Sequence, residues 1–242
     1  MMSTFLLPKS FCESINAGLR KFWWGFPQDK RHSLSLLAWD NICQPKAFGG
    51  LGIRSMLSLN NSLLAKLGWK LISNQPLLWV DVLWAKYLRN GVSFLKAPNS
   101  PLSSWIWKGL LKNRKVVEKG ACISISNGLN VEIWNSPWIP QCLLLSLFLT
   151  QICSLFQIFF CFGPHHSRSR VWNTLLLHDL FDLATVHCIE SIHLAQTVSF
   201  DKWQWVLSPS GIFSVKSAMK LRSLPLEDLP FFLQNLGINY GD

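Results

Sequence analysis

The spacing of apolar residues changes near residue 120, and this change limits the folds open to the chain. Before it, apolar side chains recur every three to four residues, which is the period of an amphipathic α-helix. After it, residues 122–126 and 130–134 alternate apolar and polar side chains around Asn127-Gly128, a strong local signal for a β-hairpin. We therefore expect an α+β fold with a mostly helical N-terminal half.

Four helices are expected before residue 120, each with an apolar face. The first starts with a capping-box pattern formed by Ser10 and Glu13, and the fourth ends at Gly120. The leucines of the second are expected to be core. In chain order, the apolar faces are Phe11, Ile15, Leu19 and Phe22; Leu59, Leu63, Leu67 and Leu71; Val80, Leu83, Trp84 and Tyr87; and Trp107, Leu110 and Leu111.

Two small β-hairpins are expected in the C-terminal half, within a fragmentary fold. The second runs from residues 202–206 through the turn at 208–211 to residues 212–215, and a helix follows from Ser217. The glycines of Gly49-Gly50-Leu51-Gly52 favour a structural turn over a phosphate loop, because no Walker lysine follows them.

The positive charge is concentrated in the first half of the chain. Residues 1–120 carry 17 Lys and Arg against 5 acids, a net of +12, whereas residues 121–242 carry 6 against 8, a net of −2. This excess favours RNA or DNA as a partner, although a cationic surface can also serve solubility alone. The strongest basic patch is the exposed side of the fourth helix, where we expect Lys108, Lys112, Arg114 and Lys115 to contact phosphates.

Aromatic residues offer a second means of binding nucleic acid. Thirteen tryptophans are present, and most occupy positions that face a core. Trp23, Trp24 and Trp107 are the candidates for stacking on unpaired bases.

Residues 142–162 are apolar and uncharged over a length that would span a bilayer. Three interpretations stay open: a membrane span, a buried core segment, or an insert produced by a frameshift or by decay of the gene. The N-terminus has no basic region before its apolar stretch and does not resemble a signal peptide. With seven cysteines and no C-x-x-C pair, the chain is expected inside the cell, in the nucleus or the cytoplasm.

No constellation of catalytic or metal-binding residues stands out. Phosphoryl transfer needs clustered carboxylates to hold metal ions, and the one adjacent acidic pair, Glu227-Asp228, follows Pro225 without a preceding strand. Neither Cys161 with His165 and His166 nor His187-Cys188 with His193 has zinc spacing. We expect no enzymatic activity, no cofactor and no metal.

Several segments together resemble the region after the polymerase core in plant non-LTR (LINE-type) retrotransposon reverse transcriptases. The resemblance covers most of the chain, and the tail resembles the opening of the reverse transcriptase zinc-binding domain. The segments are Phe5-Leu6-Leu7-Pro8-Lys9, Phe22-Trp23-Trp24-Gly25, Trp39, Pro45-Lys46, Gly49-Gly50-Leu51-Gly52-Ile53-Arg54, Leu63-Leu64-Ala65-Lys66, Trp69, Trp84-Ala85-Lys86-Tyr87, Ser104-Trp105, Gly128, Ile133-Trp134, Pro137-Trp138, and Asp201, Trp203 and residues 211–218.

The resemblance implies a non-catalytic fragment of a polyprotein. The polymerase's catalytic aspartates would lie upstream of Met1, the zinc ligands would lie downstream, and the ribonuclease H acids are absent too. Relics of such elements often carry the names of their parents, reverse transcriptase or ribonuclease H. The implied organisation is a basic helical region at 1–120, a hairpin unit at 121–141, an anomalous apolar segment at 142–170 and the start of a zinc-binding domain at 171–242.

Overall fold

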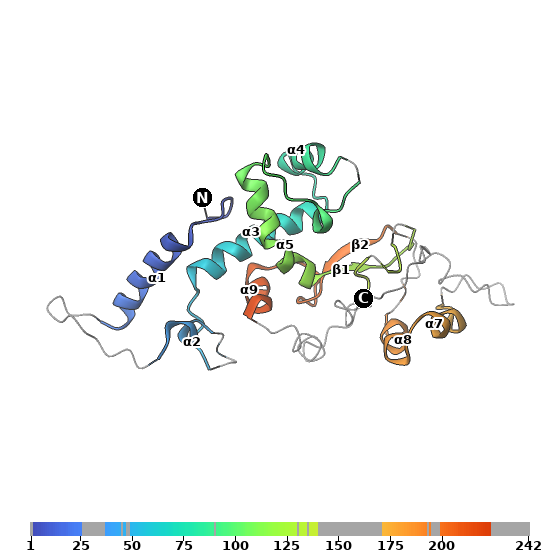
Figure 1. Ribbon diagram of the computed structural model, residues 1–242. Coiled ribbons are helices and arrows are strands. Elements are labelled where there is room, and N and C mark those ends of the chain that lie inside the picture. The colour runs from blue at the N-terminus through green and yellow to red at the C-terminus, as the bar shows by residue number, and fades with distance from the viewer. Residues whose placement is uncertain are drawn as a thin grey trace. The chain divides into compact units, whose positions relative to one another are not determined.

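The computed structural model describes residues 2–25, 37–44, 46, 49–89, 91–129, 131–134, 136–139, 171–192, 194 and 199–223. Within them the fold is helix-rich α+β with a two-stranded antiparallel sheet, which confirms the predicted fold class (Figure 1). The chain divides into two compact units. The first comprises Met1–Glu118 and Ser214–Pro225, and the second comprises Lys119–Phe213 and Leu226–Asp242.

The first unit is built around helix α3 (Met56–Ile72). This helix packs against α1, α4 and α9 (Figure 1). It also packs against a short 3-10 helix, η2. Because neighbours surround it, α3 buries residues around most of its circumference. The other elements are α1 (Lys9–Trp23), α2 (Trp39–Cys43), α4 (Leu78–Tyr87), η2 (Phe94–Lys96), α5 (Trp105–Gly120), which this unit contains up to Glu118, and α9 (Val215–Ser223).

The core face of α3 differs from the predicted leucine stripe. Leu71 is fully buried, but Leu59, Leu63 and Leu67 are only half-buried. The buried side chains lie at other positions around the same turns of the helix and include Leu64, Ala65, Trp69 and Ile72. In α5, by contrast, the predicted inward residues Trp107, Leu110 and Leu111 are all buried, as expected.

Helix α1 begins one residue before the predicted capping box. Pro8 takes the N-cap position and no side chain caps the helix, so the pairing of Ser10 with Glu13 was wrong. Proline suits a helix start because its φ is already helical and it has no N–H to leave unpaired. The helix therefore starts at Lys9, with Ser10 inside its first turn.

The glycine-rich segment after α2 is a structural turn, as predicted. Gly49 and Gly52 have φ values of 80° and 72°, in the left-handed region that glycine tolerates. Leu51 N–H donates to the Ile42 carbonyl at 3.0 Å, and Gly52 N–H donates to the Gln44 carbonyl at 2.9 Å. These amides are therefore used within the turn.

The second unit contains the sheet, and its pairing differs from the sequence prediction. Strand β1 (Ala121–Ser124) pairs antiparallel with β2 (Lys202–Trp205), in a register from Ala121 opposite Trp205 to Ser124 opposite Lys202. Each strand belongs to a predicted hairpin, but each pairs with the other. The two local hairpins were therefore wrong. Helices α7 (Thr174–Leu180) and α8 (Leu183–Glu190) complete the described part of this unit.

The first hairpin is replaced because a distant carboxylate binds its turn. Asp201 Oδ1 accepts hydrogen bonds from Ser126 N–H at 2.7 Å and from Gly128 N–H at 3.0 Å. Asp201 directly precedes β2, so these bonds tie the start of β2 to the loop after β1. The residues expected to form the return strand join a buried cluster with side chains of α7 and α8, which includes Val131, Ile133, Trp138, Leu177, Val186 and Ile189.

The second hairpin forms its turn but no return strand. Trp205 N–H donates to the Gly211 carbonyl at 2.8 Å, and Gly211 N–H donates to the Ser208 carbonyl at 2.9 Å. The chain then enters a helix, because Ser214 Oγ accepts from Ser217 N–H at 3.1 Å and so acts as an N-cap. Helix α9 begins at Val215, two residues before the predicted start.

Among the described residues, no helix has the length and apolar character needed to cross a bilayer. The apolar segment at 142–162, with its three interpretations, lies outside them.

Candidate nucleic-acid interface

Contacts with α4 fix the start of helix α5, which carries the predicted basic residues. Ser104 N–H donates to the Tyr87 hydroxyl at 3.0 Å, and Ser104 Oγ accepts from Trp107 N–H at 3.3 Å as an N-cap. The Tyr87 ring stacks on Trp107 with centroids 4.4 Å apart. Burial raises the pKa of Tyr87, but hydrogen bonding with Ser104 and the nearby Lys86 ammonium outweigh it, so this pKa lies below its ordinary value.

Three of the four predicted phosphate-binding residues lie on one face of α5. Lys108, Lys112 and Lys115 follow the i, i+4, i+7 spacing, which places them within an arc of about 60° on a helix with 3.6 residues per turn. All three side chains are exposed. The described residues place no carboxylate within salt-bridge distance of them. We call this surface the lysine face.

Arg114 lies apart from the lysine face. Its side chain is half-buried, and one guanidinium N–H donates to the Ala97 carbonyl at 2.6 Å. Lys108 Nζ also donates to a carbonyl, that of Pro101 at 2.6 Å, but its side chain remains exposed. A lysine ammonium has three donors and a guanidinium has five, so both retain further N–H groups. The structure thus groups three of the predicted residues and separates the fourth.

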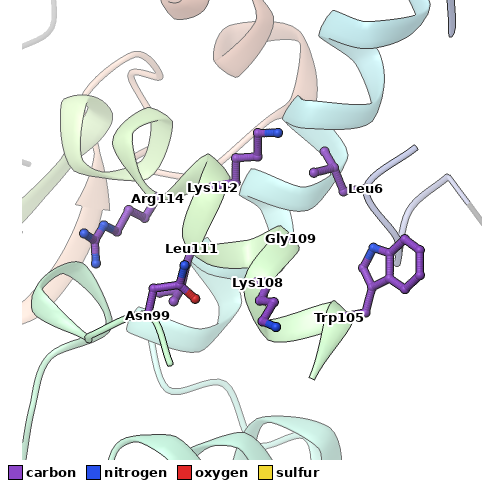
Figure 2. A pocket seen from close by; sticks show the side chains of 8 residues that line it. All are labelled: Leu6, Asn99, Trp105, Lys108, Gly109, Leu111, Lys112 and Arg114. Carbon is purple, nitrogen blue, oxygen red and sulfur yellow. The ribbon is translucent and has the colours of Figure 1, made fainter. Parts of the chain in front are cut away.

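An open groove of about 690 Å³ adjoins the lysine face. Figure 2 shows Leu6 and Trp105 on one side of α5, and Asn99 and Arg114 on the other. The Trp105 side chain is 69% exposed. The groove therefore combines cationic groups with an accessible indole. It is lined by Leu6, Asn99, Trp105, Lys108, Gly109, Leu111, Lys112 and Arg114.

A buried asparagine holds the N-terminal segment beside the groove. Asn60, which is 0% exposed, accepts from Leu7 N–H at 3.0 Å through its Oδ1. Its Nδ2 donates to the carbonyls of Met2 at 2.6 Å and Phe5 at 2.8 Å. Leu6 lies within this clamped segment, close enough to α5 that a methyl added at Gly109 would be 3.4 Å from its Cβ. Asn60 therefore positions one wall of the groove.

The tryptophans expected to stack on bases need one correction. Trp107 is 1% exposed and packs between Tyr87 and Phe94, so its ring faces are not open to a ligand. Trp23 is 47% exposed and Trp24 is half-buried. Trp105 is more exposed than either and was missed. The helical spacing of Trp105 and Lys108, three residues apart, was the signal in the sequence that could have found it.

The other groups considered from the sequence do not form a site in the described part of the chain. There, no group of three or more His, Cys, Asp or Glu side chains lies close enough to hold a metal ion. Burial raises the pKa of the Cys122 thiol to about 12, so this thiol stays protonated at neutral pH. Cys161, His165, His166, His193, Glu227 and Asp228 lie outside the described residues.

Comparison with known proteins finds relatives in Arabidopsis thaliana. A protein named "putative ribonuclease H protein" is 33% identical over 252 aligned positions, which cover 95% of this chain and 37% of that protein. An "uncharacterized mitochondrial protein" is 29% identical over 139 positions, which cover 57% of this chain and 89% of that protein. The chain thus spans little more than a third of the first relative. No family model and no solved structure matches it.

Proposed function

We propose that this chain is a non-catalytic segment of a retrotransposon-derived protein and that it binds RNA or DNA through the lysine face of α5. The observation that carries the proposal is the alignment of Lys108, Lys112 and Lys115 on one exposed helix face, with no carboxylate partner among the described residues. Similarity to a plant protein named for ribonuclease H supports a source in a mobile element. The finer assignment, the region after the polymerase core of a non-LTR reverse transcriptase, belongs to this proposal.

The physical basis of binding is release of counterions from the phosphate backbone. Each lysine that neutralises a phosphate frees condensed cations, so affinity falls as salt rises, with a log-log slope of about −0.9 per contact for duplex DNA. Three contacts would contribute about 2.7 to this slope. Arg114 also lines the groove, and a guanidinium has N–H donors beyond the one bonded to Ala97, so it contributes beside the lysines.

Charge reversal at the lysine face tests the proposal. The triple variant Lys108→Glu, Lys112→Glu, Lys115→Glu is expected to weaken binding to a duplex oligonucleotide at least tenfold at low salt and to reduce the salt slope by about 2.7. Fluorescence anisotropy over a range of salt concentrations measures both quantities. Arg114 is left unchanged because its substitution would also break its hydrogen bond to the Ala97 carbonyl, and the resulting loss of stability would be mixed with the effect on binding.

A matched control separates the lysine face from net charge. The triple variant Lys9→Glu, Lys21→Glu, Lys66→Glu also replaces three exposed lysines of the first unit and lowers the formal net charge by the same six units from +10. It should leave most of the affinity and the slope intact. Equal losses in the two variants, or no loss in the first, would show that the lysine face is not the binding site.

Ribonuclease H activity is the second candidate, because one relative carries that name. Cleavage of an RNA–DNA hybrid by this class of chemistry needs carboxylates that hold metal ions side by side. We expect the purified chain to leave such a hybrid intact in magnesium or manganese. Cleavage that copurifies with the chain through two different columns, and is lost on adding a chelator, would replace the non-catalytic proposal.

A chain that binds nucleic acid belongs in a compartment that contains it. We infer the nucleus or the cytoplasm as its place. One relative is named a mitochondrial protein, and that name applies to the relative.

A further inference from the structure

We propose that Trp105 stacks on an unpaired base and makes the groove selective for single-stranded nucleic acid. This inference rests on the proposed function and adds the class of ligand. It starts from the exposure of Trp105, the first residue of α5, which is 69% exposed. Two residues later on the same helix, Trp107 is 1% exposed and belongs to the hydrophobic core. The two rings therefore have different surroundings, and packing within the described residues accounts only for Trp107.

The indole and the lysines are presented together. With 3.6 residues per turn, Trp105, Lys108 and Lys112 fall within an arc of about 60°. Both lysines line the groove with Trp105. Figure 2 shows the indole on the same side of α5 as Leu6, whose backbone is held by the Asn60 clamp. One face of the helix thus offers an aromatic surface and two ammonium groups within about two helical turns.

This combination fits a single strand better than a duplex. In a single strand the bases are free to leave their stack, so a base can lie on the indole while neighbouring phosphates reach the lysines. In a duplex the base faces are covered by the adjacent base pairs, and only the phosphates remain for the lysine face. The positive charge beside the indole therefore favours a polyanion with exposed rings.

The test compares two substitutions of Trp105 on two ligands. Trp105→Leu keeps an apolar side chain but removes the aromatic ring, whereas Trp105→Phe keeps a ring. The ligands are oligodeoxythymidine of about 16 nucleotides and a duplex of the same length. Trp105→Leu is expected to lower single-strand affinity by roughly 5- to 150-fold and duplex affinity by less than twofold, with an unchanged salt slope. Trp105→Phe should retain most of the single-strand affinity.

An exposed aromatic residue outside the groove supplies the control. Phe22, 85% exposed on α1, does not line the groove, and Phe22→Leu should leave both affinities unchanged. Equal single-strand losses for Phe22→Leu and Trp105→Leu would overturn the inference. So would a Trp105→Leu variant that binds the single strand like the wild type, or one that loses both ligands equally.

The lysine variants separate this inference from the proposed function. If charge reversal at the lysine face lowers the affinity for both ligands while Trp105→Leu lowers neither affinity, the inference about the base fails and the proposed function stands. If charge reversal changes neither affinity, the proposed function fails, and the inference fails with it.

Discussion

Truncating Trp205 to alanine should lower the free energy of unfolding of the second unit by about 3–5 kcal/mol, the usual cost of removing a large buried aromatic. Trp205 is 0% exposed and ends strand β2, opposite Ala121. Its ring packs against Phe213, with centroids 4.5 Å apart. The loss should be large because a wide cavity would open beside the short sheet.

The companion substitution is Gly120→Ala. Whether it raises or lowers the free energy of unfolding should depend on the presence of the Trp205 ring. A methyl at residue 120 would overlap the six-membered ring of Trp205. In the wild type we expect this overpacking to cost about 1–3 kcal/mol. In the Trp205→Ala background the ring is gone, so the same methyl should cost nothing or stabilise by up to about 1 kcal/mol through helix propensity.

Urea unfolding followed by far-UV circular dichroism measures the four proteins of this cycle. The coupling energy between the two positions should be at least about 1 kcal/mol, since residues in direct contact rarely behave additively. Additive effects within about 0.5 kcal/mol would contradict the packing of Trp205 on Gly120.

Replacing Asn60 with leucine should destabilise the first unit by about 3 kcal/mol and release the N-terminal segment. The buried amide takes part in three hydrogen bonds, to Leu7 N–H and to the carbonyls of Met2 and Phe5. Leucine satisfies none of them, and each buried polar group left without a partner costs about 1–3 kcal/mol. Hydrogen exchange at the Leu7 amide should accelerate more than exchange in α3.

Ser62 provides the control for Asn60 on the same helix. Its hydroxyl is buried and has no hydrogen-bond partner among the described residues. Ser62→Ala should therefore be neutral or slightly stabilising, because it removes a buried hydroxyl that has no partner and breaks no hydrogen bond. Protection of Leu7 that survives Asn60→Leu would show that the N-terminal segment is held by packing alone.

The longer helices before residue 120 could be predicted from the sequence because their periodicity is local, whereas the short α2 was not among those expected. The spacing of Trp107, Leu110 and Leu111 indicated the buried side of α5, and all three are buried. The same spacing indicated the exposed side that carries Lys108, Lys112 and Lys115. Arg114 was predicted to lie with them on the basis of its positive charge alone, without regard to its angular position around the helix. Helical geometry would have separated it, but its bond to Ala97 had no signal in the sequence.

The pairing of strands was decided only by the tertiary structure. Asn127-Gly128 is a strong local hairpin signal, yet the amides on either side of Asn127 bind Asp201, more than seventy residues away. A carboxylate at that distance leaves no mark on the local alternation of residues, so the prediction favoured the neighbouring segment. Local periodicity thus indicated the longer helices before residue 120 and the exposed lysines of α5, but it misplaced the buried face of α3. Long-range hydrogen bonds and packing decided that β1 pairs with β2 and that α9 packs against α3. They also decided that Trp105 is exposed to solvent beside the lysines.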